Sequence, residues 1–151
     1  MMNDIRDSFL RFFKRIEYKL KNISEEDIDD DYILINPPEI VDFMKRKCGM
    51  LELVNDSLIL IRKYYPDCPV YLVFEDYCEE EGNGCIFALV ISEKLSFDEN
   101  YELYESLCHE FYGIENNYFD SFLNFNMDFR TGLEYYEQWR LDELNKNKTP
   151  S

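Results

Sequence analysis

The chain has 151 residues, of which 46% are apolar and 17% aromatic, and it carries a formal net charge of −16 at pH 7. This length suits one domain, and the aromatic content excludes an intrinsically disordered protein. The chain has 32 acidic and 16 basic residues. This excess of negative charge argues against direct contact with nucleic acid or an anionic membrane, because both are negatively charged. We therefore expect that an electrostatically bound partner would be a basic protein.

The cysteines and the N-terminal residues indicate the cellular compartment in which the protein resides. No two cysteines have C-x-x-C spacing, and Met1 leads into a charged amphipathic segment rather than an apolar leader. The longest apolar run, residues 85–91, is too short to span a membrane. We expect a cytoplasmic protein with reduced thiols. The cysteines are Cys48, Cys68, Cys78, Cys85 and Cys108.

Residues 1–23 form the first of four expected segments, and apolar spacing predicts an amphipathic helix over residues 4–21. One face of this helix carries Ile5, Phe9, Phe12, Phe13, Ile16 and Leu20. The opposite face carries Arg6, Arg11, Lys14, Arg15 and Lys19. An aromatic stripe of this kind needs a partner surface, so one hypothesis is homo-oligomerisation through the N-terminal helix.

Residues 24–36 are expected to form an acidic linker, because six of the eight residues from Ser24 to Asp31 are acidic. The apolar residues 32–35 fit either a short strand or a tether that docks on the core. Residues 37–146 would then form the core, with residues 147–151 as a frayed polar tail. Together the four segments make a single domain.

The core is expected to begin with two helices. Asn36 can cap the first, and Pro37 suits its first position, where the missing N–H costs nothing. This helix would run to about Lys47 and end at Gly49. A second apolar stripe predicts a helix from Leu51 to Tyr65, which Pro66 would end.

Two runs rich in β-forming residues, 70–74 and 85–91, predict buried strands joined as a hairpin by the acidic loop 75–84. Ser96 and Glu99 then match a capping box that opens another helix. We expect Gly113 to end that helix. Its expected buried residues are Phe97, Tyr101, Tyr104, Cys108 and Phe111.

Strict alternation of apolar and polar residues predicts a strand over residues 122–130, with Leu123 among the residues that face inward. A last helix is expected over residues 133–144. The resulting prediction is an α+β fold: a small, mostly antiparallel sheet of three main strands with helices packed on one face.

The stretch from Tyr64 to Arg130 carries Tyr65-Pro66-Asp67 ahead of a strand, then an acidic turn, a strand and an acidic helix, and it closes on Asp128-Phe129-Arg130. In this pattern residues 64–130, under half of the chain, resemble a family of small uncharacterised prokaryotic α+β proteins. Some proteins of that kind are encoded beside toxin-like genes, so the resemblance implies an antitoxin-like role. It implies no site residues.

The sequence predicts no catalytic, cofactor or metal site. His109 is the only histidine, and its neighbour Cys108 would point elsewhere on a helix, so the two are not a preassembled nucleophile and base. The loop 75–84 is rich in oxygen ligands but lacks the order of an EF-hand, so whether it binds a cation stays open. The polar positions Asn124, Asn126 and Asp128 are a weaker candidate site on a wet strand face.

Acidic residues concentrate in one region, since residues 75–115 contain 12 acids and only one base, Lys94. The candidate partner-binding residues are Glu75, Asp76, Glu79, Glu80, Glu81, Asp98, Glu102 and Glu105. We expect these acids to lie on one side of the sheet or at its rim. The functional prediction is an acidic protein-interaction module, an inhibitor or antitoxin-like protein that binds a basic partner. The alternative is a small enzyme or ligand-binding domain with a pocket of tyrosines and carboxylates.

Overall fold

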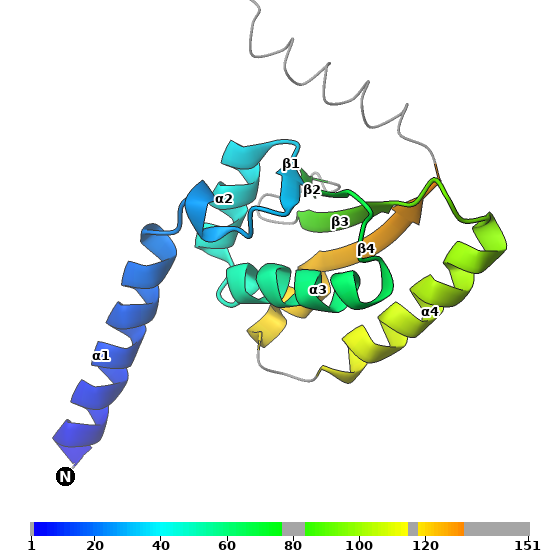
Figure 1. The fold of residues 1–151 in the computed structure, drawn as a ribbon. Coiled ribbons are helices and arrows are strands. Elements are labelled where there is room, and N and C mark those ends of the chain that lie inside the picture. Colours follow the sequence, from blue (N-terminus) through cyan, green and yellow to red (C-terminus); the bar gives the residue numbers. More distant parts are fainter. Residues whose placement is uncertain (1, 77–83, 115–117, 132–151) are drawn as a thin grey trace, which may run out of the picture.

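The computed structural model describes residues 2–76, 84–114 and 118–131. These residues confirm the predicted α+β class (Figure 1). The expected helix over residues 133–144 and the tail lie outside them. The elements in chain order are α1 (Met2–Lys21), η1 (Glu25–Asp27), β1 (Tyr32–Leu34), α2 (Pro37–Arg46), α3 (Met50–Tyr64), β2 (Val70–Glu75), β3 (Cys85–Ile91), α4 (Phe97–Gly113), η2 (Phe119–Asn124) and β4 (Phe125–Arg130).

The sheet has four strands in the order β1-β2-β3-β4 and is mixed, so the prediction of a mostly antiparallel sheet of three strands was wrong. Of the three strand pairs that the structure describes, only β2 and β3, joined as a hairpin, run antiparallel. The pairs β1–β2 and β3–β4 are parallel. The physical reason is the helical connections: α2 and α3 return the chain between β1 and β2, and α4 does so between β3 and β4.

The four residues 32–35, which fitted a strand or a tether, join the sheet. Tyr32 pairs with Val70 in the parallel register, and the backbone N–H of Ile35 donates to the carbonyl of Leu72 at 3.0 Å. The Tyr32 hydroxyl also donates to the carbonyl of Val54 in α3, at 2.7 Å. The expected linker segment therefore supplies an edge strand of the sheet.

One face of the sheet packs against α2, α3 and α4, with α3 and α4 side by side (Figure 1). Residues on this face alternate along each strand, as the pleat requires, and include the buried Leu72, Ala88 and Met127. The opposite face has a smaller buried cluster, which contains Val73 and Leu89. Both faces of the central hairpin are thus apolar.

Strand β4 begins later than predicted. Residues 119–124 form the 3-10 helix η2, and Leu123, expected to face inward, is 83% exposed. From Phe125 onward the predicted alternation holds, since Phe125 and Phe129 are buried while Asn126 is exposed. The apolar residue at 123 matched the strand pattern, but the turn that carries the chain into β4 occupies that position.

Helix α4 begins at the predicted cap, where the Glu99 N–H donates to the Ser96 hydroxyl at 3.2 Å. The face that it buries differs from the prediction, because Phe97 is 64% and Tyr101 48% exposed. The helix instead turns Asn100 and Leu107 inward, together with Phe111, whose burial was predicted. The Asn100 amide donates to the carbonyls of Ser92 and Leu95, which holds the first turn in this orientation.

Helix α1 extends away from the rest of the molecule and approaches it only at its last turns (Figure 1). There Leu20 packs against the main core and Ile23 belongs to it. Within the described ranges, no helix is both long and apolar enough to cross a membrane.

Candidate functional site: an acidic and aromatic face on helix α4

The predicted acidic residues fall into two groups in the structure. Asp98, Glu102 and Glu105 are exposed on α4 at spacings of four and three residues, which places them on one stripe of the helix. Glu75 and Asp76 lie at the end of β2, where Glu75 pairs with Cys85. Because α4 follows the other end of β3, Asp98 and Glu75 lie toward opposite ends of that strand. Glu79, Glu80 and Glu81 lie outside the described residues.

Three exposed aromatic residues border the acidic stripe of α4. Phe97 and Tyr112 are each 64% exposed, and Tyr101 is 48% exposed. The ring of Phe97 stacks on Tyr101 with centroids 6.3 Å apart and contacts Phe129 of β4 at 5.6 Å. Rings held in this way present apolar surface at little entropic cost. We call the following residues the α4 face: Phe97, Asp98, Tyr101, Glu102, Glu105 and Tyr112.

An open cleft of about 650 Å³ runs beside this face, between α4 and the end of α3. Four tyrosines, two glutamates and the single histidine contribute to it, so it has the residue types of the predicted tyrosine and carboxylate pocket. Its lining residues are Tyr64, Tyr101, Tyr104, Glu105, Ser106, Cys108, His109, Glu110 and Tyr112.

Glu110 ties the two walls of the cleft together. Its Oε1 accepts from the Lys63 ammonium at 2.6 Å and from the Tyr64 hydroxyl, both at the end of α3. The hydrogen bond from Lys63, followed by that from Tyr64, lowers the pKa of the Glu110 carboxyl. The same contact with Glu110 raises the pKa of Lys63. Glu110 is therefore engaged within the fold, unlike the exposed acids of the stripe.

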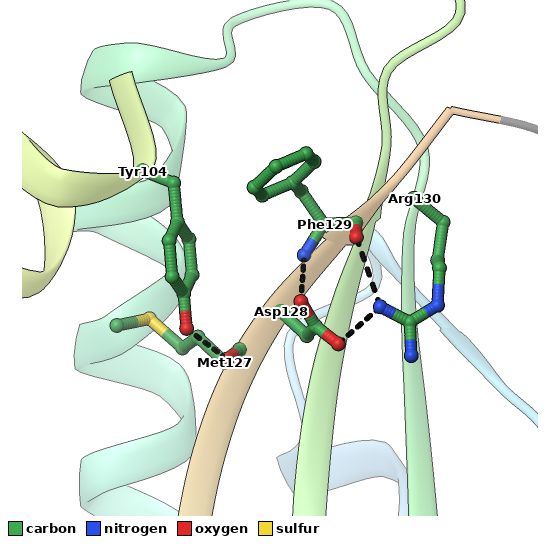
Figure 2. Close-up of polar contacts among 5 residues, drawn as sticks. All are labelled: Tyr104, Met127, Asp128, Phe129 and Arg130. Carbon is green, nitrogen blue, oxygen red and sulfur yellow. Dashed lines mark hydrogen bonds and ion pairs between the residues drawn. The ribbon is translucent and has the colours of Figure 1, made fainter. Parts of the chain in front are cut away.

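The thiol in the cleft is not activated. Burial raises the pKa of Cys108, and the charge of Asp128 raises it further, against an opposing hydrogen bond with Tyr104. A raised pKa keeps a thiol protonated, whereas nucleophilic cysteines need the thiolate. Burial also raises the pKa of Tyr104, whose hydroxyl donates to the carbonyl of Met127 at 2.7 Å (Figure 2).

The three polar residues of the predicted wet strand face bind groups of the protein itself. The Asn124 amide donates to the carbonyl of Gly84 at 2.9 Å, and the Asn126 amide contacts the Cys85 sulfur at 3.4 Å. Asp128 accepts from the Phe129 N–H at 2.8 Å and from the Arg130 guanidinium (Figure 2). These contacts brace the hairpin and β4.

In the part of the chain that the structure describes, no three histidine, cysteine or acidic side chains are grouped so that they could hold a metal ion. The loop for which cation binding was left open lies mostly in residues 77–83, outside that part.

Sequence reasoning found the acids of α4 but missed the aromatics beside them, because it assigned Phe97 and Tyr101 to the core. One signal was available: Asn100, Leu103 and Leu107 also recur at helical spacing and compete for the buried face. The contacts of Tyr64 with α4 join residues 46 positions apart, which spacing alone does not reveal. Comparison with models of protein families, with curated proteins and with solved structures found no match to this chain.

Proposed function

We propose that the protein binds a basic protein partner through the α4 face. The observation that carries this proposal is the combination on one helix surface of three exposed carboxylates with three exposed aromatic rings. Aromatic residues are enriched at protein interfaces, and tyrosine is enriched among the hot spots, while charges at the rim set specificity and association rate.

The carboxylates of the stripe are available to such a partner. Among the described residues, no ion pair joins Asp98, Glu102 or Glu105 to a cation, whereas Glu110 is paired with Lys63. Like charges at helical spacings of three and four residues cost a few tenths of a kcal/mol each. A cationic partner would relieve this repulsion and would be drawn to the acidic surface from a distance.

The aromatic rings suit the same kind of partner. Arginine and lysine side chains pack over tyrosine and phenylalanine rings, with a contribution of about 0.5–1 kcal/mol at exposed sites. An arginine that reaches Tyr101 would lie beside the carboxylates of Asp98 and Glu102. The α4 face can therefore bind the apolar stem and the charged end of one basic side chain.

An inhibitor or antitoxin-like role follows if the basic surface that the α4 face covers is the partner's own phosphate-binding site. Asp98 and Glu102 are four residues apart, so their backbone positions are separated by about 6 Å along the helix axis. A row of carboxylates at such spacing can replace phosphate groups on a nuclease-type toxin or another nucleic-acid-binding protein. Binding would then exclude the nucleic acid.

The test uses the full chain as bait in an extract of the native host, with the triple variant Asp98→Asn, Glu102→Gln, Glu105→Gln. A matched control, Glu25→Gln, Glu26→Gln, Asp30→Asn, removes the same charge from another exposed region. We expect one basic protein to be retained at low salt by the wild type and the control but not by the α4 variant. Equal retention by all three, or recovery of no basic protein, would reject the proposal.

A second function is favoured by one specific observation. An apolar cavity of about 300 Å³ lies where β2 begins and β3 ends, and Tyr64, Tyr65, Asp67 and Glu93 contribute to it. Asn100, whose side-chain amide donates to the carbonyls of the lining residues Ser92 and Leu95, has a buried Oδ1 without a hydrogen-bond partner among the described residues. Small-molecule sites have this size and this mixture of apolar walls with a few polar groups. This cavity supports the alternative of a ligand-binding domain.

That alternative is tested by a thermal-shift screen with metabolites and metal ions. A bound ligand raises the melting temperature, and the rise should shrink in the double variant Asp67→Asn, Glu93→Gln. Absence of any shift across the screen, or a shift that the double variant keeps in full, would count against a site in this cavity.

A further inference from the structure

We propose that a second copy of this chain covers the apolar stripe of α1, so that two α1 helices pair antiparallel in a symmetric dimer. This inference concerns a surface different from the α4 face and does not depend on the proposed function.

The stripe is large and exposed. Ile5 is 70%, Phe9 60%, Phe12 55% and Phe13 49% exposed, although all four are apolar and lie on one side of the helix. In proteins, most of the stability of a helix comes from the packing of its apolar face rather than from intrinsic helix propensity. Helix α1 projects from the rest of the molecule (Figure 1), and a contiguous exposed aromatic surface on such a helix marks an interaction site.

The stripe continues into a groove beside the body of the molecule. This groove, of about 410 Å³, lies between the last turns of α1 and the first turn of α3. Its apolar walls come from Phe12, Ile16, Leu20, Ile23 and Leu51, and Asp27 and Glu52 stand at its rim. A second hollow, formed by Ile5, Phe9 and Phe12, extends the stripe toward the N-terminal end. Together the groove and the hollow form a surface long enough to bind a second helix.

This surface is filled when the α1 helices of two copies pair antiparallel, with the centre of the pair near residue 11. Phe9 and Phe12 of the two copies then interdigitate at the centre. Ile5 of each copy lies opposite residues 17–18 of the other, where it can enter the groove between Ile16 and Leu20. Each copy both provides and fills one groove, as an isologous interface requires.

The charges beside the stripe fit this register. Arg6 lies where the polar face of the helix borders the stripe, next to Phe13. Glu17 is eleven residues from Arg6 and so lies within about 20° of it around the helix, on the same flank of the stripe. In an antiparallel pair equal flanks face each other, and Arg6 of one copy comes opposite Glu17 of the other. The symmetry makes this contact twice. This complementarity favours a second copy as the occupant.

The charges argue against an anionic membrane as the occupant. Helix α1 carries six bases but also Asp4, Asp7 and Glu17, and residues 24–31 add six acids directly after it. Those acids would be held against the lipid headgroups and repelled by them. A lipid surface also leaves the groove beside α3 unexplained, whereas a second helix fills it.

The test is a charge exchange in the full chain, read as mass in solution by analytical ultracentrifugation. Arg6→Glu and Glu17→Arg should each weaken the dimer by about tenfold, because each creates two repulsive contacts. The double variant should restore affinity to within about threefold of the wild type. Phe9→Ser should give a monomer. The control Tyr18→Ser should not, because Tyr18 is nine residues from Phe9 and so lies on the face of the helix opposite the stripe, 71% exposed in the wild type.

Three results would overturn the proposal. One is a wild-type chain that stays monomeric at about 100 µM, since dimerisation depends on protomer concentration. Another is a double variant as weak as either single variant, which would place α1 on a different surface of the second copy. The third is flotation of monomeric protein with phosphatidylserine vesicles, which would assign the stripe to lipid. Circular dichroism of each variant separates loss of pairing from loss of fold.

Discussion

The side-chain amide of Asn36 satisfies both backbone hydrogen-bonding groups of Phe74. Its Oδ1 accepts from the Phe74 N–H at 2.9 Å, and its Nδ2 donates to the Phe74 carbonyl at 2.8 Å. The amide thereby extends the pairing of β1 with β2 beyond the end of the strand. The sequence predicted Asn36 as a helix cap, and it does precede α2, but its side chain makes no capping hydrogen bond.

The first prediction concerns this contact. Asn36→Ala should lower the free energy of unfolding by about 1–3 kcal/mol, because it removes two hydrogen bonds in a partly buried place. The matched control is Asn55→Ala, which removes two bonds of the same kind, with Asp27 and Asp29, at an exposed place and should cost less. Urea unfolding measures both. An equal or larger cost at Asn55 would contradict the role assigned to Asn36.

Gly49 is predicted to be irreplaceable by residues with a side chain. Its φ is +88°, and an added Cβ would lie 2.8 Å from the carbonyl oxygen of Tyr118. Gly49→Ala should therefore destabilise the fold by about 1–2 kcal/mol or more. Gly113→Ala is the control, since a Cβ there meets nothing within 4 Å, and it should be neutral or slightly stabilising. Thermal unfolding of the two variants side by side checks the contrast.

Alkaline pH should destabilise the protein through its tyrosines. Burial raises the pKa of Tyr65 and of Tyr118 from 10 to about 12, and in Tyr118 the hydrogen bond with Asp56 adds to burial. The folded state thus favours the protonated phenol. This contribution is complete below pH 10 and is lost as the pH rises through about 12.

Urea unfolding across this pH range measures the loss. Tyr118→Phe removes one of the titrating groups, so its stability should fall less steeply with pH than that of the wild type. Near neutral pH the same variant should cost about 1 kcal/mol, because the 2.6 Å hydrogen bond to Asp56 is gone. A variant with an unchanged alkaline slope would show that Tyr118 does not contribute.

Cys85 should resist alkylation in the native protein. Burial raises its pKa to about 11, the nearby Glu75 carboxylate adds to this, and the hydrogen bond from Asn126 opposes it. Only the thiolate reacts, so near neutral pH the rate should be about 100-fold below that of the unfolded chain. Mass spectrometry of peptides after timed iodoacetamide treatment gives the rate. Equal rates in native and urea-unfolded protein would contradict the burial of this thiol.

Local pattern predicted most elements of this fold. The strand at residues 85–91 was placed without error, and α2 lies within one residue of its expected end at Lys47, because Pro37 and Gly49 act through local backbone geometry. The parallel pairing of β1 with β2 could not be read in this way. It depends on where the chain returns after α2 and α3, which is a property of the packed helices.

The orientation of α4 shows most clearly what local sequence pattern could not predict. In the sequence of α4, two sets of residues recur at helical spacing and could form the buried stripe. One set includes Phe97 and Tyr101, and the other includes Asn100 and Leu107. Hydrophobicity favoured the first, and the structure buries the second, because the Asn100 amide finds two backbone carbonyls there. The orientation that buries Asn100 and Leu107 also exposes the rings of Phe97 and Tyr101, which belong to the α4 face. The sequence therefore predicted the acidic residues of the α4 face. The exposure of its aromatic residues depends on tertiary contacts and could not be predicted.

The central claim, that the α4 face binds a basic partner, is tested most directly by titration calorimetry of the captured partner against three forms of the protein. The account predicts that neutralising Asp98, Glu102 and Glu105 weakens binding by about 100-fold or more and flattens its dependence on salt. It predicts that the matched control, neutral at Glu25, Glu26 and Asp30, stays within about threefold of the wild type. Equal affinities and equal salt dependence for the two variants would contradict it, because net charge rather than the α4 face would then determine binding.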